Sequence, residues 1–142
     1  MVEAWKPYCG NMIERSADSG GQKHMTDAVV VLFNSTSDTP TYCGSISESG
    51  KIQVTPEEAA ALLNGFLDQS DLQSHGIKIG GTKYTYLRQD DGILIGKLKE
   101  GGCSIAKTKQ TVLVGICGNG CQLGTVNKAV YQIREWLLKS GV

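Results

Sequence analysis

The chain has 142 residues, with fourteen basic and fourteen acidic side chains and a sequence pI near 6.7. Balanced charge argues against nucleic acid as a partner, because it gives no general attraction to phosphates. No apolar run approaches the ~18 residues of a membrane span, and the N-terminus lacks the cationic start and apolar stretch of a signal peptide. We therefore expect a single cytoplasmic domain covering residues 1–142.

The N-terminal segment is predicted to form a short amphipathic helix. Trp5, Tyr8 and Met12 recur at helical spacing, which gives the helix one apolar face. Pro7 lacks an amide hydrogen and is tolerated only in a first helical turn, so the helix should begin near Trp5 or one residue later. The polar stretch 15–27 that follows is predicted to be a loop.

Three strands are predicted next. Residues 28–34, AVVVLFN, form a β-branched apolar run of strand length. Residues 41–47 and 51–54 are two shorter runs, separated by the turn sequence ESG.

A second helix has a well-marked start. Thr55 is placed to act as the N-cap, Pro56 suits the first helical position, and Glu58 lies three residues after the cap, as in a capping box. The apolar run AAALLNGFL continues this helix to about residue 67. Residues 68–76 are predicted to be a loop.

Residues 77–117 are predicted to form an antiparallel meander of strands, divided by glycine-containing turns at 80–81, 91–92 and 101–102. The Asp-Gly pair at 91–92 is the strongest hairpin signal of the three. Alternation along KYTYLR predicts that two sets of side chains face opposite sides of the sheet, namely Lys83, Thr85 and Leu87 against Tyr84, Tyr86 and Arg88.

The last predicted element is a helix with one buried stripe. Val126, Val130, Ile133 and Leu137 recur at spacings of three and four, and Thr125 is the expected N-cap. Strands without regular alternation with helices indicate an α+β fold, in which the first and last helices can cover a common face of the sheet.

The turn before this helix resembles a dinucleotide-binding fingerprint only superficially. Gly118, Gly120 and Gly124 have the wrong spacing, and the chain has no further parallel strand after the helix. We interpret these glycines as turn residues, with a phosphate at the helix N-terminus as the alternative.

The five cysteines are irregularly spaced, so five reduced thiols in a reducing compartment are expected. No zinc-ligand spacing occurs, and no motif for a nucleophile, a P-loop or paired carboxylates is present. We expect no metal, no cofactor and no enzymatic activity.

Four stretches, in this order and spacing, carry a resemblance to a known family: AWKPY, VTPEEAAALL, IGGTKYTYLRQDDG, and KTKQTVLVGIC leading to GTVNKAVYQIREWLLKSGV. The chain resembles a profilin over nearly its full length. The resemblance implies a central antiparallel sheet, with the N- and C-terminal helices packed on one face and smaller helical elements on the other. It also implies a monomeric cytoskeletal regulator that binds actin monomers.

Profilins bind proline-rich ligands in an aromatic groove between the terminal helices. The resemblance assigns this role to five residues: Trp5, Tyr8, Tyr42, Trp136 and Leu137. Polyproline II is a preformed helix that loses little entropy when it docks between flat rings. The interpretation that competes with this one is that the rings only fill core space between two helices.

The resemblance places actin binding on the last helix and the adjoining strands. The residues implied are Lys83, Tyr86, Arg88, Lys97, Lys99, Gly124, Asn127, Lys128 and Tyr131. Their five cationic side chains would form a local basic patch suited to an acidic partner. A further family property, binding of phosphatidylinositol bisphosphate, would need at least ~4 such side chains to converge.

Two alternatives belong to other functional classes. One is a profilin-shaped scaffold in membrane trafficking that dimerises and does not bind actin. The other is a nucleotide-binding enzyme that uses the GNGCQLG turn.

Overall fold

The computed structural model describes residues 2–34, 40–118 and 120–142. The strands of these residues are β1 (Met25–Asn34), β2 (Thr41–Ser47), β3 (Ile77–Ile79), β4 (Thr82–Asp90), β5 (Ile93–Leu98), β6 (Gly101–Lys107) and β7 (Thr111–Cys117). The helices are a 3-10 turn η1 (Val2–Trp5), α1 (Lys6–Arg15), α2 (Pro56–Leu67), α3 (Ser70–His75) and α4 (Leu123–Lys139).

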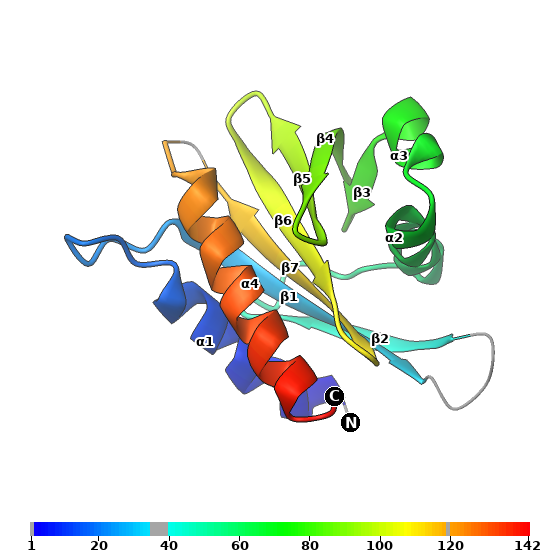
Figure 1. Ribbon diagram of the computed structural model, residues 1–142, viewed down its shortest axis with the longest axis horizontal. Coiled ribbons are helices and arrows are strands. Elements are labelled where there is room, and N and C mark those ends of the chain that lie inside the picture. Colours follow the sequence, from blue (N-terminus) through cyan, green and yellow to red (C-terminus); the bar gives the residue numbers. More distant parts are fainter. Residues whose placement is uncertain (1, 35–39, 119) are drawn as a thin grey trace.

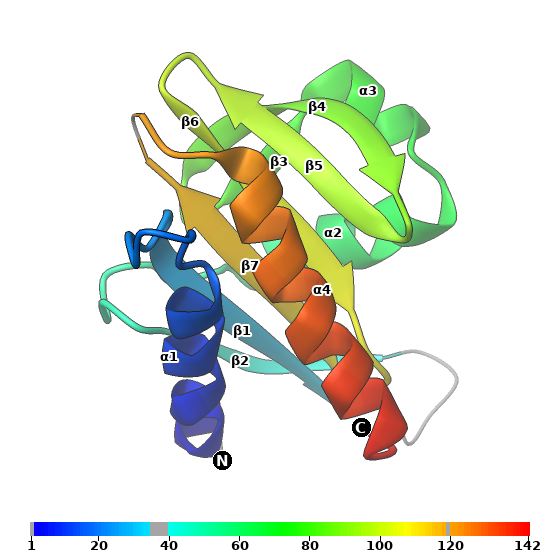
Figure 2. The same ribbon diagram turned by 60° about the vertical axis from the view of Figure 1, so that its left-hand side comes forward.

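The seven strands of the described residues form one sheet in the order β2-β1-β7-β6-β5-β4-β3, and every neighbouring pair is antiparallel. The terminal helices α1 and α4 lie side by side on one face, and α2 and α3 lie on the other (Figure 1). Figure 2 shows that α1 and α4 run in opposite directions, so that both ends of the chain lie at one end of this helix pair. The expected α+β fold is confirmed.

The central strands are apolar throughout because helices cover both of their faces. In β1, Ala28 and Val30 belong to the core beneath α1 and α4, whereas Val29 and Val31 belong to the core beneath α2 and α3. This explains why the sequence 28–34 reads as a continuous apolar run and not as an alternation.

The stripe predicted on the last helix is buried as expected, since Val126, Val130, Ile133 and Leu137 are all at most 3% exposed. Close approach of α4 to β7 requires a residue without a side chain on the strand. A Cβ added to Gly115 would lie 2.8–2.9 Å from the side chains of Val126 and Val130. A larger residue there would push the helix off the sheet.

The Asp91–Gly92 turn forms the β4–β5 hairpin that the sequence predicts. Both residues have positive φ, 50° for Asp91 and 81° for Gly92, as a type I′ turn requires. The backbone twist of such a turn matches the twist of the strands that it joins.

Three predicted features differ from the structure. Residues 51–54 are not a strand, because the amides of Ile52 and Val54 donate to the hydroxyls of Ser47 and Ser45 in place of strand carbonyls. The predicted loop at 68–76 contains α3. This helix buries a single side chain, Leu72, and one apolar residue cannot produce a helical periodicity in the sequence. The last helix begins at Leu123 with Gln122 as its N-cap, and therefore Thr125 lies inside the helix.

A β-bulge in β4 overturns part of the predicted alternation. Tyr86 pairs with Gly96 and Arg88 pairs with Ile95, so Leu87 is the extra residue. Paired residues share a face of the sheet. Arg88 therefore lies with Ile95 on the α4 face, and not with Tyr86 as the sequence predicts.

The capping box of α2 is present and also holds the β3–β4 turn. Thr55 accepts from the Glu58 amide, and the Glu58 carboxylate accepts from the amides of Thr55, Gly80 and Gly81. One carboxylate thus satisfies three backbone donors from two segments.

We predict that Glu58→Ala lowers the free energy of unfolding by about 2 kcal/mol, because three amides lose a charged acceptor. Denaturant unfolding followed by circular dichroism is the measurement. Glu57→Ala is the matched control, since it removes a neighbouring charge from the same helical turn without removing these bonds. Equal effects of the two substitutions would show that the effect comes from charge near the helix terminus and not from the three bonds.

Candidate binding surfaces

Three aromatic rings meet where α1 packs against α4. The rings of Trp5 and Tyr8 are 5.1 Å apart between centroids, and those of Tyr8 and Trp136 are 5.6 Å apart. Trp136 is 52% exposed, and Trp5 and Tyr8 are half-buried. The three rings therefore form a continuous surface that is open to solvent along the helix pair, which we call the aromatic cluster.

The aromatic cluster presents polar atoms as well as rings. Among the described residues, no hydrogen bond is made by the Tyr8 hydroxyl or by the indole N–H of Trp5 or Trp136. Tyr and Trp side chains of this kind present an apolar ring together with one donor.

The backbone around the cluster is held firmly. Pro7 lies in the first turn of α1, as the sequence predicts, so it costs no helical hydrogen bond. Leu137 is fully buried in the core between the helices and the sheet, and is not at the surface. Val142 donates to the Leu137 carbonyl and packs on the same core. Leu137 thus supports the cluster from beneath.

Tyr42 is not brought to the aromatic cluster. Its ring meets Phe33 edge to face at 6.2 Å, and its hydroxyl donates to the Val54 carbonyl. Both rings pack on the core beneath α2 and α3. A bulge in the β1–β2 pairing next to Phe33 changes the alternation at this point.

A second candidate surface lies at the N-terminal half of α4. A hollow of about 280 Å³ is lined there by four of the predicted actin-contact residues, together with the β4–β5 turn. These four are Gly124, Asn127, Lys128 and Tyr131. We call this the α4 hollow.

Two residues to which the sequence analysis assigns no binding role shape the α4 hollow from the sheet. Asp90 and Asp91 line it, and the Asp91 carbonyl accepts from the Arg134 guanidinium, which lies over the Tyr131 ring at 4.8 Å. The Asp91–Gly92 signal predicts the hairpin but not this binding role, since the hairpin and α4 meet only in the folded chain.

The predicted basic residues fall into two groups. Arg88 and Lys97 lie on the α4 face of the sheet, and Lys99 lies in the exposed turn after β5. Lys83 lies opposite Lys78 of the edge strand β3. Tyr86 packs on the core beneath α2 and α3, away from the α4 face.

The charges around the α4 hollow have both signs. Arg88 is paired with Asp90 at 2.6 Å, and Asp91 adjoins that pair. Within the described residues, Lys128 and Lys97 form no ion pair. The surface is therefore mixed in charge, in contrast to the basic patch that the sequence suggests.

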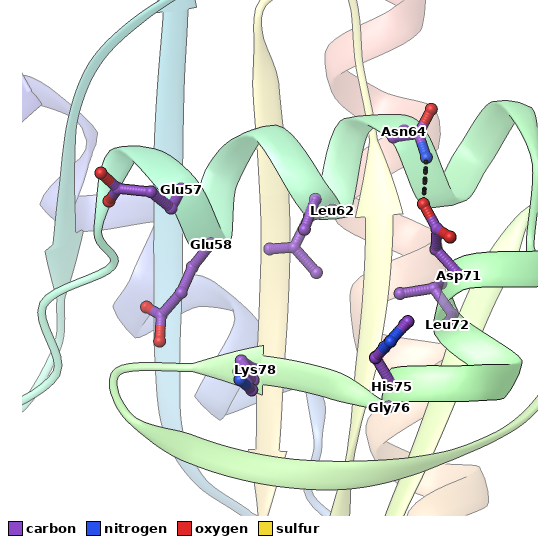
Figure 3. Close-up of a pocket in the computed structure, with 10 residues that line it drawn as sticks. Glu57, Glu58, Leu62, Asn64, Asp71, Leu72, His75, Gly76 and Lys78 are labelled. Carbon is purple, nitrogen blue, oxygen red and sulfur yellow. Dashed lines mark hydrogen bonds between the residues drawn. The ribbon is translucent and has the colours of Figure 1, made fainter.

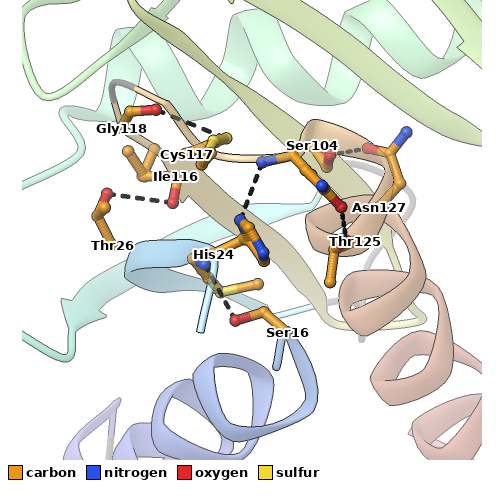
Figure 4. The surroundings of a disulfide bond; sticks show 12 residues. Ser16, His24, Thr26, Ser104, Ile116, Cys117, Gly118, Thr125 and Asn127 are labelled. Atoms are coloured by element: carbon orange, nitrogen blue, oxygen red, sulfur yellow. Dashed lines mark hydrogen bonds between the residues drawn. A yellow bond between two sulfur atoms is a disulfide. The ribbon is translucent and has the colours of Figure 1, made fainter. Parts of the chain in front are cut away.

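The turn that leads into α4 is cross-linked. Cys117 and Cys121 form a disulfide, so the expectation of five free thiols is wrong for these two residues. His24 bridges the same region, because its Nδ1 accepts from the Gln122 amide and its Nε2 contacts the Asp18 carboxylate at 2.9 Å. Figure 4 shows the disulfide and His24 beside the chain that leads into α4.

A third hollow, of about 370 Å³, lies on the opposite face of the molecule between α2, α3 and β3 (Figure 3). Leu62 and Leu72 form its apolar floor, and Glu57, Asp71 and Lys78 stand at its rim. None of the residues predicted to bind a ligand lies there.

Comparison with known proteins identifies the family. The family model described as Profilin matches residues 3–142. The chain belongs to the profilin family. It is 33% identical over 138 residues to the profilin of Strongylocentrotus purpuratus, covering 94% of this chain and 96% of that protein.

Solved profilin structures share the fold. Acanthamoeba castellanii profilin IB superposes with a TM-score of 0.72 at 23% identity, covering 97% of this chain and 99% of the other. Mouse profilin IIa, solved in complex with a double repeat from the FH1 domain of mDia1, gives 0.70 at 19% identity with the same coverage.

The family excludes one alternative. Profilins are non-enzymatic, so the expectation that the chain is not an enzyme is confirmed and the nucleotide-binding enzyme is set aside. No helix of the described residues is long and apolar enough to cross a membrane.

We predict that Leu137→Ala and Trp136→Ala, at adjacent positions, differ strongly in stability. Leu137→Ala should cost about 2–5 kcal/mol because it leaves a cavity in a closed core. Trp136→Ala should cost about 1 kcal/mol, the value of an exposed aromatic contact. Denaturant unfolding of both variants checks this. A loss of several kcal/mol for Trp136→Ala would mean that the ring fills the core.

Proposed function

We propose that this profilin-family chain binds proline-rich segments at the aromatic cluster and monomeric actin at the α4 hollow. It would thereby act as a cytoplasmic regulator of the actin cytoskeleton. The observation that carries the proposal is the contact of Trp5, Tyr8 and Trp136 across two helices from opposite ends of the chain.

The dimensions of the aromatic cluster suit a polyproline II helix. Such a helix repeats every three residues and rises about 9 Å per turn. Neighbouring ring centroids are 5.1 and 5.6 Å apart, less than one such turn, so successive rings can contact neighbouring prolines of one ligand. Each proline ring would lie on an aromatic ring, and the free indole N–H and hydroxyl groups would donate to carbonyls of the ligand.

A solved relative supports this assignment. Mouse profilin IIa was captured with a double repeat from the FH1 domain of mDia1, and its fold matches this chain over nearly the full length. We extend that kind of ligand to this chain because its own aromatic residues meet in one open surface. An arrangement that only filled the core would bury Trp136, which is instead half exposed.

Actin binding is proposed at the α4 hollow because four of the implied residues line it together. Asn127 is fixed by its bond to Ser104, and Tyr131 is fixed by the Arg134 guanidinium. Fixed side chains around a hollow lose little entropy when a partner binds. We do not extend the proposal to phosphoinositides, because Asp90 already pairs with Arg88 and fewer cations than expected are free.

We predict that decaproline changes tryptophan fluorescence of the wild-type protein, and that Trp5→Ala and Trp136→Ala each weaken binding about thirtyfold. The reason is that removal of an anchor aromatic costs about 2 kcal/mol. Tyr131→Ala is the matched control, since it removes a half-exposed ring from another part of α4 and should leave the affinity unchanged. Absence of any fluorescence or calorimetric response to millimolar decaproline would remove this half of the proposal.

We predict that Lys128→Glu weakens actin-monomer binding at least tenfold, as expected for a reversed charge at an interface. Lys51→Glu, at an exposed position after β2 where no actin contact is predicted, is the charge-matched control and should bind nearly as well as wild type. Sequestration of pyrene-labelled actin is the measurement, with circular dichroism to check the fold. If the wild-type protein neither binds actin nor is monomeric in solution, the dimeric trafficking scaffold becomes the better assignment.

A further inference from the structure

The disulfide between Cys117 and Cys121 lies at the junction of β7 and α4. The two residues are four apart in sequence, and their Cα atoms are 5.9 Å apart, within the range that a disulfide spans without backbone movement. Cys117 is 3% exposed and packs in the core, whereas Cys121 is only partly buried. Cys121 is therefore the more exposed end of the bond, and a reagent from solvent would meet it before Cys117.

The other three cysteines are not placed to attack this disulfide. Cys9 and Cys103 are fully buried, and burial raises the pKa of both thiols to about 12. Thiolate is the attacking species in disulfide exchange, and at neutral pH these two residues supply almost none. Cys43 is exposed but lies on β2, which borders β1 at the edge of the sheet.

The disulfide restrains the start of α4. Cys121 is followed at once by Gln122, whose amide donates to His24, and then by the first helical turn. Gly124, Asn127 and Lys128, which line the α4 hollow, belong to the first two turns. Cys121 thus lies three residues before Gly124, the first α4 residue that lines the hollow, and the cross-link is at the opposite end of α4 from Trp136.

We propose that Cys117 and Cys121 form a thiol–disulfide exchange site for a small thiol of the glutathione class, and that opening the bond loosens the first turn of α4. An effect on actin would rest on the function proposed above, whereas the exchange and the loosening do not.

The exchange proceeds in two balanced steps. The thiolate of the first small thiol attacks Sγ of Cys121, the S–S bond breaks, and its electron pair leaves on Sγ of Cys117, which takes up a proton. A second small thiolate attacks the small-thiol sulfur of the mixed disulfide and releases Cys121, which is protonated in turn. The protein gains two electrons and two protons, and two small thiols become one oxidised dimer.

The first experiment is a redox titration of the folded chain in mixtures of reduced and oxidised glutathione. After acid quenching, denaturation and alkylation, mass analysis should show three adducts under oxidising conditions, matching the three free cysteines, and five under reducing conditions. Cys43→Ser should lower both counts by one and leave the midpoint unchanged. With Cys121→Ser, the change from three to five adducts should disappear, because Cys117 then has no partner for a disulfide.

Two outcomes would overturn the exchange site. Full alkylation in every mixture would mean that the disulfide does not form in the folded protein. Three adducts in every mixture, including excess dithiothreitol, would mean that the bond is locked and is not exchangeable.

The second experiment tests the loosening by amide hydrogen exchange. Reduction should speed exchange at residues 122–126 on the order of tenfold through local opening, with residues 133–137 unchanged. Cys121→Ser should reproduce the reduced pattern without any reductant. Unchanged exchange at 122–126 would refute the coupling. Neither readout uses actin or a proline-rich ligand, so failure here is distinguishable from failure of the proposed function.

Discussion

The burial of one stripe of α4 on the sheet is the interaction on which both proposed surfaces depend. Val126, Val130, Ile133 and Leu137 lie in the core, and Gly115 lets the helix approach β7 closely. Because the stripe fixes the rotation of the helix about its axis, the opposite side of α4 is fixed as well. One packing contact therefore sets the N-terminal turns over the β4–β5 hairpin and the last turns beside α1.

The two ends of α4 have different physical characters, and this favours two partners for one helix. The C-terminal end presents tilted aromatic rings in contact with one another, each with a polar donor, which suits an extended chain without charge. The N-terminal end presents Lys128 next to the Arg88–Asp90 pair, together with a fixed amide at Asn127, which suits a folded partner with matching charges. Since the surfaces lie at opposite ends, simultaneous occupation by two ligands is sterically reasonable.

The sequence was sufficient to predict those features of the structure that depend only on neighbouring residues. The capping box at Thr55 and the Asp91–Gly92 turn are local, so both are confirmed. Bulges are set by strand pairing, and this is why the faces of Arg88 and Tyr42 could not be read from alternation. The hollows were missed for a related reason, since they depend on which distant segments meet. The disulfide joins cysteines only four residues apart, and it was missed because spacing alone does not show whether two thiols face each other. The meeting of Trp5 and Tyr8 with the last helix is likewise a tertiary contact, and the family resemblance, not periodicity, predicted it.

The central claim is that the open face of the α1–α4 pair is a site for proline-rich ligands. Its most direct test is a two-dimensional NMR titration of isotope-labelled protein with decaproline, which follows every backbone amide and both indole N–H groups at once. The account predicts shifts confined to the first turns of α1, the last turns of α4 and the indoles of Trp5 and Trp136. Shifts centred on the hollow between α2 and α3, with both indoles unmoved, would contradict it.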